Sequence, residues 1–401
     1  MKFSIVNLGC KVNQVESDAF EALLGSGAGC YTSPDEADVI VVNTCTVTGE
    51  AEKKTRKSVR QALRANEEAR VIVTGCAAAI DPSFFADLSD RVTVVPKAEM
   101  EDFLAHLTDD AAVAVQPAAL HHGHARIGIK VQDGCDNACT YCIVHVARGR
   151  ATSRPVDEVA AEAVALARSG VREIVLTGIN LGSYCDGGQD LADLCRCLLE
   201  ITADVHDPGE PPCRFRVGSI EPQDVTAEFV GLFSEADGRL CRHLHLPMQS
   251  GSSKVLREMA RPYDAHEFRQ LVDYLHAAVP GIALTTDVIA GFPGETDEDF
   301  ADTCELCRCA GFSKIHVFPY SKREGTPAAA RADQVPPEVK SARAAALRVL
   351  SDELAAADRA LRAGTVEFAL VEAPGRATAE SYHEVRVAAA LPVGALVEVQ
   401  M

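Results

Sequence analysis

The sequence contains no apolar run long enough to cross a membrane. No stretch approaches the roughly 18 uninterrupted apolar residues that a transmembrane helix needs. The opening residues MKFSIVNLGC lack the long apolar region and the small-residue cleavage site of a secretory leader. We therefore expect a cytoplasmic protein that does not associate with membranes.

Basic residues are comparatively few. Lysine and arginine total 39, against 58 aspartate and glutamate residues, and the formal net charge is −19. This charge opposes non-specific binding to phosphate backbones. A nucleic-acid partner would therefore have to be held by local basic patches.

Cysteine, in contrast, is abundant, with 15 residues in a chain of 401. A reducing cytosol disfavours a disulfide framework, so clustered cysteines there indicate metal ligation or redox chemistry. Hydrophobic residues make up 47% of the chain and charged residues 24%. This composition supplies enough apolar material for two or three ordinary domains.

Strand and helix patterns alternate over residues 1–112 and predict an N-terminal open parallel α/β sheet domain. Its expected strands lie at residues 3–8, 39–43, 71–74 and 92–95. Cys10, Cys45 and Cys76 each follow one of these strands by about two residues. Ligands of such sheets lie beyond the carboxyl ends of the strands, so we expect the three thiols to converge at one edge.

Three further segments complete the predicted organisation. Residues 113–125 have the composition of a linker. Residues 126–350 repeat a strand and a helix six times, which is typical of a partial TIM barrel of the (β/α)₆ kind, with its chemistry at the carboxyl mouth. Residues 351–401 predict the end of a connecting helix and a small all-β appendage.

The most specific chemical signal is the loop GCDNACTYC at residues 134–142, directly after the first barrel strand. Its cysteines are Cys135, Cys139 and Cys142. Thiolates are the ligands of four-iron clusters, and three of them leave one iron open for an exogenous ligand. Half of a zinc site and buried structural thiols are the alternatives. A second cysteine pair of suitable spacing is not evident, and a polar loop is an unusual place for core thiols.

This loop resembles the CxxxCxxC signature of radical S-adenosylmethionine (SAM) enzymes, and the rest of the chain resembles the methylthiotransferases. The GCKVNQ context at Cys10 is similar to the branch that modifies threonylcarbamoyladenosine beside the tRNA anticodon. The isopentenyladenosine branch usually has GCQMN there, and the ribosomal-protein branch GCPKN. The matching segments are NLGCKVNQVE (7–16), VNTCTVT (42–48), VTGCA (73–77), VLTGINLGSY (175–184), HLHLPMQSGSSKVL (243–256), TDVIAGFPGE (286–295) and HVFPYSKREGT (316–326).

The resemblance implies a radical SAM domain with two [4Fe-4S] clusters and SAM as cofactors. Cys135, Cys139 and Cys142 would hold the cluster whose open iron binds SAM, which is cleaved reductively to a 5′-deoxyadenosyl radical. Cys10, Cys45 and Cys76 would hold an auxiliary cluster, with unrelated core thiols as the alternative. No side chain is expected to act as a catalytic acid or base. The rest of the SAM pocket would come from Tyr141, Thr177, Gly178, Asn180, Ser219 and Gly291.

Two groups of basic residues are candidate RNA contacts, because an RNA backbone can be positioned by local cations even on an acidic protein. An ordinary solvated helix face is the alternative for the first group. The C-terminal appendage resembles a short TRAM domain, an RNA-binding module, with GRATAESY at residues 375–382 as its nearest match. The candidates are Lys53, Lys54, Arg56, Lys57 and Arg60 in one helical pattern, and Arg148 and Arg150 after the cysteine loop.

Together these patterns suggest methylthiolation at C2 of N6-threonylcarbamoyladenosine (t6A) at tRNA position 37. The expected partners are the anticodon stem-loop of tRNA and an electron donor such as flavodoxin or ferredoxin. The alternatives are the same chemistry on isopentenyladenosine of tRNA or on an aspartate of a ribosomal protein. A non-catalytic iron–sulfur electron carrier is disfavoured, because carriers normally close their clusters with four ligands.

Overall fold

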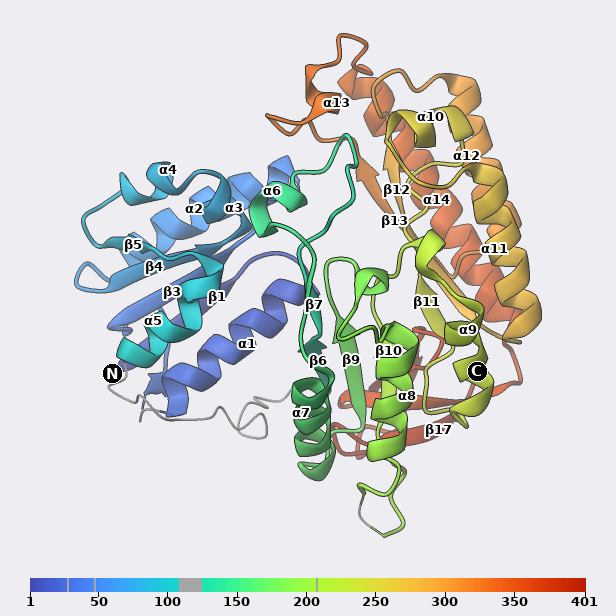
Figure 1. Ribbon diagram of the computed structural model, residues 1–401, viewed down its shortest axis with the longest axis horizontal. Helices are drawn as coiled ribbons and strands as arrows, with labels where there is room; N and C mark the ends of the chain where they lie inside the picture. Colours follow the sequence, from blue (N-terminus) through green and yellow to red (C-terminus); the bar gives the residue numbers. More distant parts are fainter. Residues whose placement is uncertain (27–28, 47, 108–124, 207) are drawn as a thin grey trace. The chain divides into compact units, whose positions relative to one another are not determined.

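The computed structural model describes residues 1–26, 29–46, 48–107, 125–206 and 208–401 (Figure 1). The predicted linker, 113–125, lies outside these residues except at its last position. The described chain forms two compact units. The first comprises residues up to 107 with 134–136 and 142–150, and the second comprises 125–133, 137–141 and the chain from 151 onward. None of the described helices is long and apolar enough to cross a membrane.

The first unit is built on a five-stranded parallel sheet in the order β2-β1-β3-β4-β5. The central strand β3 is buried at every residue, which explains its unbroken apolar run. The structure confirms the predicted parallel sheet and adds the two-residue edge strand β2. The strands are β1 (Lys2–Asn7), β2 (Cys30–Tyr31), β3 (Val39–Thr44), β4 (Arg70–Gly75) and β5 (Val92–Val94).

Helices cover both faces of this sheet (Figure 1). On one face, α1 (Lys11–Ser26) and α5 (Met100–Leu107) pack Phe20, Leu24 and Leu104 against the strands. On the other, α2 (Gly49–Ala65), α3 (Cys76–Ile80) and α4 (Pro82–Ala86) bury Val59 and Phe85. A short 3₁₀ turn, η1 (Lys97–Glu99), precedes α5. This unit also contains α6 (Val144–Arg148).

The second unit contains the predicted partial barrel. Its parallel strands form two sheets, β10-β9-β6 and β11-β12-β13. Two isolated parallel bridges connect these sheets, one from Phe215 to Leu240 and one from Ser219 to His245. The strand order therefore follows the chain from β6 to β13, as a (β/α)₆ barrel requires. The strands are β6 (Arg126–Lys130), β9 (Glu173–Thr177), β10 (Arg214–Val217), β11 (His243–His245), β12 (Ala283–Ala290) and β13 (Lys314–Pro319), with a small hairpin of β7 (Gln132–Asp133) and β8 (Thr152–Ser153).

Amphipathic helices surround this barrel and share one continuous apolar core with its strands (Figure 1). Asp190, Asp264 and Thr296 form capping boxes that begin α8, α11 and α12, which satisfies the first free amides of each helix. The helices are α7 (Val156–Arg168), α8 (Leu191–Ile201), α9 (Ala227–Glu235), α10 (Ser253–Glu258), α11 (Ala265–Ala278), α12 (Asp297–Ala310), α13 (Pro327–Ala330) and α14 (Pro337–Leu361), with 3₁₀ turns η3 (Leu181–Ser183) and η4 (Pro222–Asp224).

The C-terminal appendage is all-β, as predicted. It is a four-stranded antiparallel sheet in the order β16-β15-β14-β17. One face buries Ala369, Val371, Ala377 and Ala379 in a small core. The strands are β14 (Val366–Ala373), β15 (Arg376–Ala379), β16 (Glu384–Arg386) and β17 (Leu396–Gln400).

A buried ion cluster joins this sheet to the amino-terminal end of the barrel strands. Glu173, fully buried at the start of β9, accepts hydrogen bonds of 2.8 Å from Nε of Arg214 and of Arg216. The two arginines also donate to the carbonyls of Phe368 and Glu380 in the appendage, each at 2.8 Å. Burial alone would raise the pKa of Glu173, but the guanidinium groups of Arg216 and Arg214 hold it well below its usual range.

Replacement of this carboxylate should strongly destabilise the second unit. In Glu173→Gln, two buried guanidinium groups lose their counter-charge, a change that typically costs about 3–5 kcal/mol. Urea-induced unfolding would measure the loss. Glu372→Gln is the matched control, because Glu372 pairs with Arg126 at a more exposed position, where about 1 kcal/mol or less is expected. Equal losses in the two variants would contradict a special role for Glu173.

Candidate functional site

The structure places Cys10, Cys45 and Cys76 at one edge of the N-terminal sheet. Asn7 on β1 pairs with Asn43 on β3, which pairs with Thr74 on β4. The three strands are parallel, so their carboxyl ends lie level with one another. Each cysteine comes within three residues after the paired residue of its strand, Asn7, Asn43 or Thr74. The strand pattern predicted this arrangement of thiols.

Two glycines let the cysteine-bearing turns approach closely. A Cβ on Gly9 would lie 2.8 Å from the Cβ of Cys45 and 2.9 Å from its Sγ. A Cβ on Gly75 would lie 2.4 Å from the carbonyl oxygen of Thr44. Both glycines have positive φ, +119° and +96°, which other residues rarely adopt. The glycine before Cys10 and the glycine before Cys76 are therefore required for this geometry.

The amide of Asn13 ties two of these turns together. Its Nδ2 donates to the carbonyls of Leu8, at 2.8 Å, and Thr44, at 2.9 Å, just before Cys10 and Cys45. Its Oδ1 accepts a 2.7 Å hydrogen bond from Arg148. Because Asn13 is fully buried, these bonds fix the turns without competition from water. The functional prediction from sequence did not include Asn13, although it lies within the quoted NLGCKVNQVE segment.

Arg148 is buried rather than presented to a ligand. Its side chain is 1% exposed and donates to Glu16 at 3.1 Å as well as to Asn13. Glu16 also pairs with Lys97. We therefore assign Arg148 to positioning the turns of the first unit, and not to the RNA contact that its charge suggested.

The CxxxCxxC loop contributes residues to both units. In the first unit, the amide of Cys135 donates to the carbonyl of Gly149. In the second, Cys139 is buried and its Sγ accepts a 3.2 Å hydrogen bond from Arg261. The Arg261 guanidinium is itself held by Glu221 and by the Tyr263 hydroxyl. Sequence reasoning did not single out Arg261 or Glu221, which are distant from the loop in the chain.

The predicted SAM residues Thr177, Gly178 and Asn180 lie at the carboxyl end of β9. The amides of Ile179 and Asn180 donate to the side-chain carbonyl of Gln132, at 3.0 and 2.9 Å, which shapes the turn. Asn180 is 6% exposed, and its Oδ1 has no hydrogen-bond partner among the described residues. A buried acceptor of this kind is costly unless a ligand donor meets it.

The other predicted SAM residues have separate positions in the second unit. Ser219 follows β10, and Gly291 follows β12, where its amide donates to Glu295 at 3.0 Å. Tyr141 packs against the apolar cluster that includes Tyr320 and Ala328. All three are therefore at or beside carboxyl ends of barrel strands, where ligands of such barrels bind.

Family models match both halves of the chain. Residues 129–307 match the Radical SAM superfamily, and residues 2–95 match a model described as "Uncharacterized protein family UPF0004". The "Threonylcarbamoyladenosine tRNA methylthiotransferase MtaB" of Chlamydia pneumoniae is 37% identical over 374 residues, which cover 92% of this chain and 86% of that protein. The chain belongs to the radical SAM methylthiotransferase family.

Other relatives of this methylthiotransferase have two different names. A Bacillus subtilis protein with the same name as the Chlamydia protein is 38% identical, over 87% of this chain and 80% of its own length. The "tRNA-2-methylthio-N(6)-dimethylallyladenosine synthase" of Anaeromyxobacter dehalogenans is 36% identical over 100% of this chain and 91% of its own length. Among solved structures, the radical SAM methyltransferase TsrM of Kitasatospora setae has the same fold, with a TM-score of 0.59, 15% identity and coverage of 82% of this chain and 77% of that one.

The residues of this methylthiotransferase suit the cofactors that its family implies, SAM and a [4Fe-4S] cluster. Thiolates are the ligands such clusters use, and the loop at 134–142 supplies three. The orphaned Oδ1 of Asn180 is an acceptor suited to the ammonium group of SAM. In the described part of the chain, no three Cys, His, Asp or Glu side chains close around the position of a single ion. A cubane differs, because its irons and sulfides lie between its thiolates.

Two carboxyl groups, Glu221 beside Arg261 and Asp224 beside Asn180, have raised pKa values. Burial raises the pKa of Glu221, although Arg261 acts in the opposite direction. Burial also raises the pKa of Asp224, which a hydrogen bond with Asn180 partly offsets. Sequence reasoning did not identify either carboxyl group.

The basic residues of α2 are mostly exposed in this methylthiotransferase. Thr55, Val59 and Ala62 face the core, so the charged residues lie on the opposite side. Arg56 differs, because it pairs with Glu52 at 2.7 Å and lies over the ring of Phe84. Arg150 is 89% exposed and pairs with Asp136. The exposed basic residues of α2 are Lys53, Lys54, Lys57, Arg60 and Arg64.

Loss of the Asn13 amide should impair the N-terminal thiol site selectively. In Asn13→Ala, the turns before Cys10 and Cys45 lose their link, so anaerobic reconstitution should give a lower iron content per chain than in the wild type, and any iron held by the loop at 134–142 should remain. Iron and sulfide analysis with EPR spectroscopy would measure this. Asn66→Ala is the control, because Asn66 binds the Ala37 carbonyl near the other end of β3. Full iron content in Asn13→Ala would show that the amide is dispensable.

Proposed function

We propose that this protein methylthiolates C2 of N6-threonylcarbamoyladenosine, next to the tRNA anticodon, to give the 2-methylthio derivative. The observation that carries the proposal is the similarity of 37–38%, over most of the chain, to proteins named for that activity. The GCKVNQ context of Cys10 supports the same branch. The anticodon stem-loop of tRNA and a low-potential electron donor, a flavodoxin or ferredoxin, are then the partners, in the cytoplasm.

The target bond explains why the reaction needs a radical cofactor. An aromatic C2–H is inert to acids and bases, and a SAM-bound [4Fe-4S] cluster on Cys135, Cys139 and Cys142 supplies radical chemistry when present. The side-chain carbonyl of Asn180 would accept a hydrogen bond from the ammonium group of SAM. Tyr141 would lie beside the adenine of SAM. Thr177, Gly178, Ser219 and Gly291 would complete the pocket wall.

The N-terminal thiols would hold the sulfur source. Cys10, Cys45 and Cys76 are proposed ligands of an auxiliary [4Fe-4S] cluster, which supplies the sulfur that is methylated and transferred. The convergence of three thiols at the ends of adjacent strands supports this role, because unrelated core cysteines would have no reason to share one edge.

The α2 helix would contact the RNA. Lys53, Lys54, Lys57 and Arg60 are exposed on a helix that begins shortly after Cys45. A cationic face there would offset the acidity of the whole chain near the thiol edge. Arg56 and Arg150 would contribute less, because carboxylates already pair with them. The burial of Arg148 excludes it from this surface.

Isopentenyladenosine is the second candidate substrate. The Anaeromyxobacter relative named for that product aligns with the whole chain at 36% identity, so overall similarity separates the branches weakly. The two substrates share the ring and the reacting carbon and differ only in the group on N6. The discrimination must therefore come from the part of the site that receives this group.

Nucleoside analysis would decide between the two substrates. In a strain that lacks this gene, 2-methylthio-t6A should disappear from digested tRNA, and t6A should accumulate. Restoring the gene should restore the product. Liquid chromatography with mass spectrometry provides the measurement. Disappearance of the isopentenyl analogue instead would make isopentenyladenosine the substrate.

Cysteine variants should separate the two thiol sites. Replacement of Cys135, Cys139 or Cys142 by Ala should abolish both 5′-deoxyadenosine formation and methylthiolation. Replacement of Cys10, Cys45 or Cys76 should leave reductive SAM cleavage and abolish methylthio transfer only. The two products would be assayed side by side, with the exposed Cys30→Ala as a control in the first unit. Wild-type methylthiolation by Cys45→Ala would make the N-terminal cysteines structural.

A further inference from the structure

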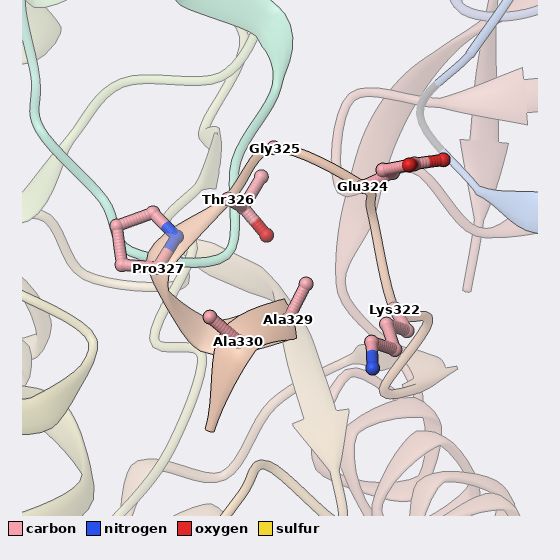
Figure 2. Close-up of a pocket in the computed structure, with 7 residues that line it drawn as sticks. All are labelled: Lys322, Glu324, Gly325, Thr326, Pro327, Ala329 and Ala330. Atoms are coloured by element: carbon pink, nitrogen blue, oxygen red, sulfur yellow. The ribbon is translucent and has the colours of Figure 1, made fainter. Parts of the chain in front are cut away.

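A pocket of about 760 Å³ lies in the turn that follows β13 (Figure 2). Its volume falls within the range of small-ligand sites. Figure 2 shows the charged residues Lys322 and Glu324 on one side of the pocket lining and mostly small residues on the other side. The lining comprises Lys322, Glu324, Gly325, Thr326, Pro327, Ala329 and Ala330.

This pocket adjoins the loop that carries the radical SAM cysteines. The amide of Ala328, between two lining residues, donates a 2.9 Å hydrogen bond to the carbonyl of Thr140. Tyr141 packs in the same apolar cluster as Ala328 and Tyr320. Because β13 ends here, the pocket is at the carboxyl mouth of the barrel, the side on which such barrels perform their chemistry.

Lys322 differs from other cations near this mouth. Arg331 pairs with Glu258 and Asp333, and Lys254 pairs with Asp299. Lys322 is exposed and has no hydrogen-bond or ion-pair partner among the described residues. Its ammonium group is therefore available to an anion that enters the pocket.

The two candidate N6 groups differ in the feature that Lys322 would recognise. The threonylcarbamoyl group carries a carboxylate, a hydroxyl and N–H donors, whereas the isopentenyl group is an uncharged hydrocarbon. We propose that this pocket receives the threonylcarbamoyl group and that Lys322 binds its carboxylate, an inference that rests on the proposed function. Pro327 and Ala329 offer apolar surface to its methyl group.

Such a pocket selects against the wrong substrate as well as for the right one. A site that hydrogen-bonds a polar group rejects an analogue without it, because its own charges are left unpaired. Lys322 is therefore a specificity-determining residue for the N6 group. It has no part in the chemical step at C2.

The test uses the reconstituted enzyme and synthetic anticodon stem-loops. One stem-loop carries t6A, and the second carries the methyl ester of t6A, which differs only in the neutralised carboxylate. A third carries isopentenyladenosine. Fluorescence anisotropy gives Kd, and turnover gives kcat and KM. Lys314→Ala is the matched control, because Lys314 is an exposed lysine at the other end of β13.

We expect Lys322→Ala to weaken binding of the t6A stem-loop about 10-fold, the typical effect of losing a hydrogen bond to a charged group. KM should rise with little change in kcat. Binding of the methyl ester should stay at the wild-type level, and Lys314→Ala should affect neither RNA.

Two results would overturn the inference. An equal loss for both stem-loops would make Lys322 a contact to the phosphate backbone, and no loss for either would leave the pocket without a role in recognition. Failure of the proposed function gives a different result, because wild-type enzyme would then modify an isopentenyladenosine stem-loop and leave the t6A stem-loop unmodified. Exposed Lys322 should be replaceable without unfolding, which circular dichroism would check.

Discussion

The candidate site depends first on the in-register parallel pairing of β1, β3 and β4. This pairing brings the carboxyl ends of three strands level, so that three short turns start from one line. Gly9 and Gly75 then permit approaches that any Cβ would block. The buried amide of Asn13 holds two of the turns by their carbonyls. A shift of one strand by one residue would reverse the facing of its side chains and separate the thiols.

A second constraint acts in the other unit, at the amino-terminal end of the barrel strands. There the Glu173 cluster anchors the C-terminal sheet, and the ring of Tyr382 lies 5.2 Å from the Arg126 guanidinium and 5.0 Å from that of Arg216. The same ring stacks on His243. The segment at 375–382, which resembles a TRAM domain, therefore uses its last residues for internal contacts. The C-terminal sheet is therefore anchored at the end of the barrel opposite the carboxyl mouth, where ligands of such barrels bind.

The local arrangement of charged residues, and not the net charge of the chain, determines where an anion can bind. The chain is strongly acidic, yet α2 presents five exposed cations and the pocket after β13 presents one more. Carboxylates neutralise Arg56, Arg150, Lys254 and Arg331. The number of basic residues in a segment therefore overstates the cations that a ligand can meet. Only the unpaired ones can contribute to binding without first losing an existing partner.

The sequence by itself determined the element types, the partial barrel and the strand-end positions of the cysteines. These features follow from local periodicity and from a topological rule, that parallel strands end at a common edge. Tertiary structure decided which side chains are available. The sequence made Arg148 a candidate RNA contact, but its side chain is buried against Asn13, 135 residues away in the chain. Glu173 with its arginines and Asn180 with its orphaned side-chain carbonyl are likewise set by neighbours remote in sequence. Local patterns specify which face a residue occupies, whereas partners and burial depend on long-range packing.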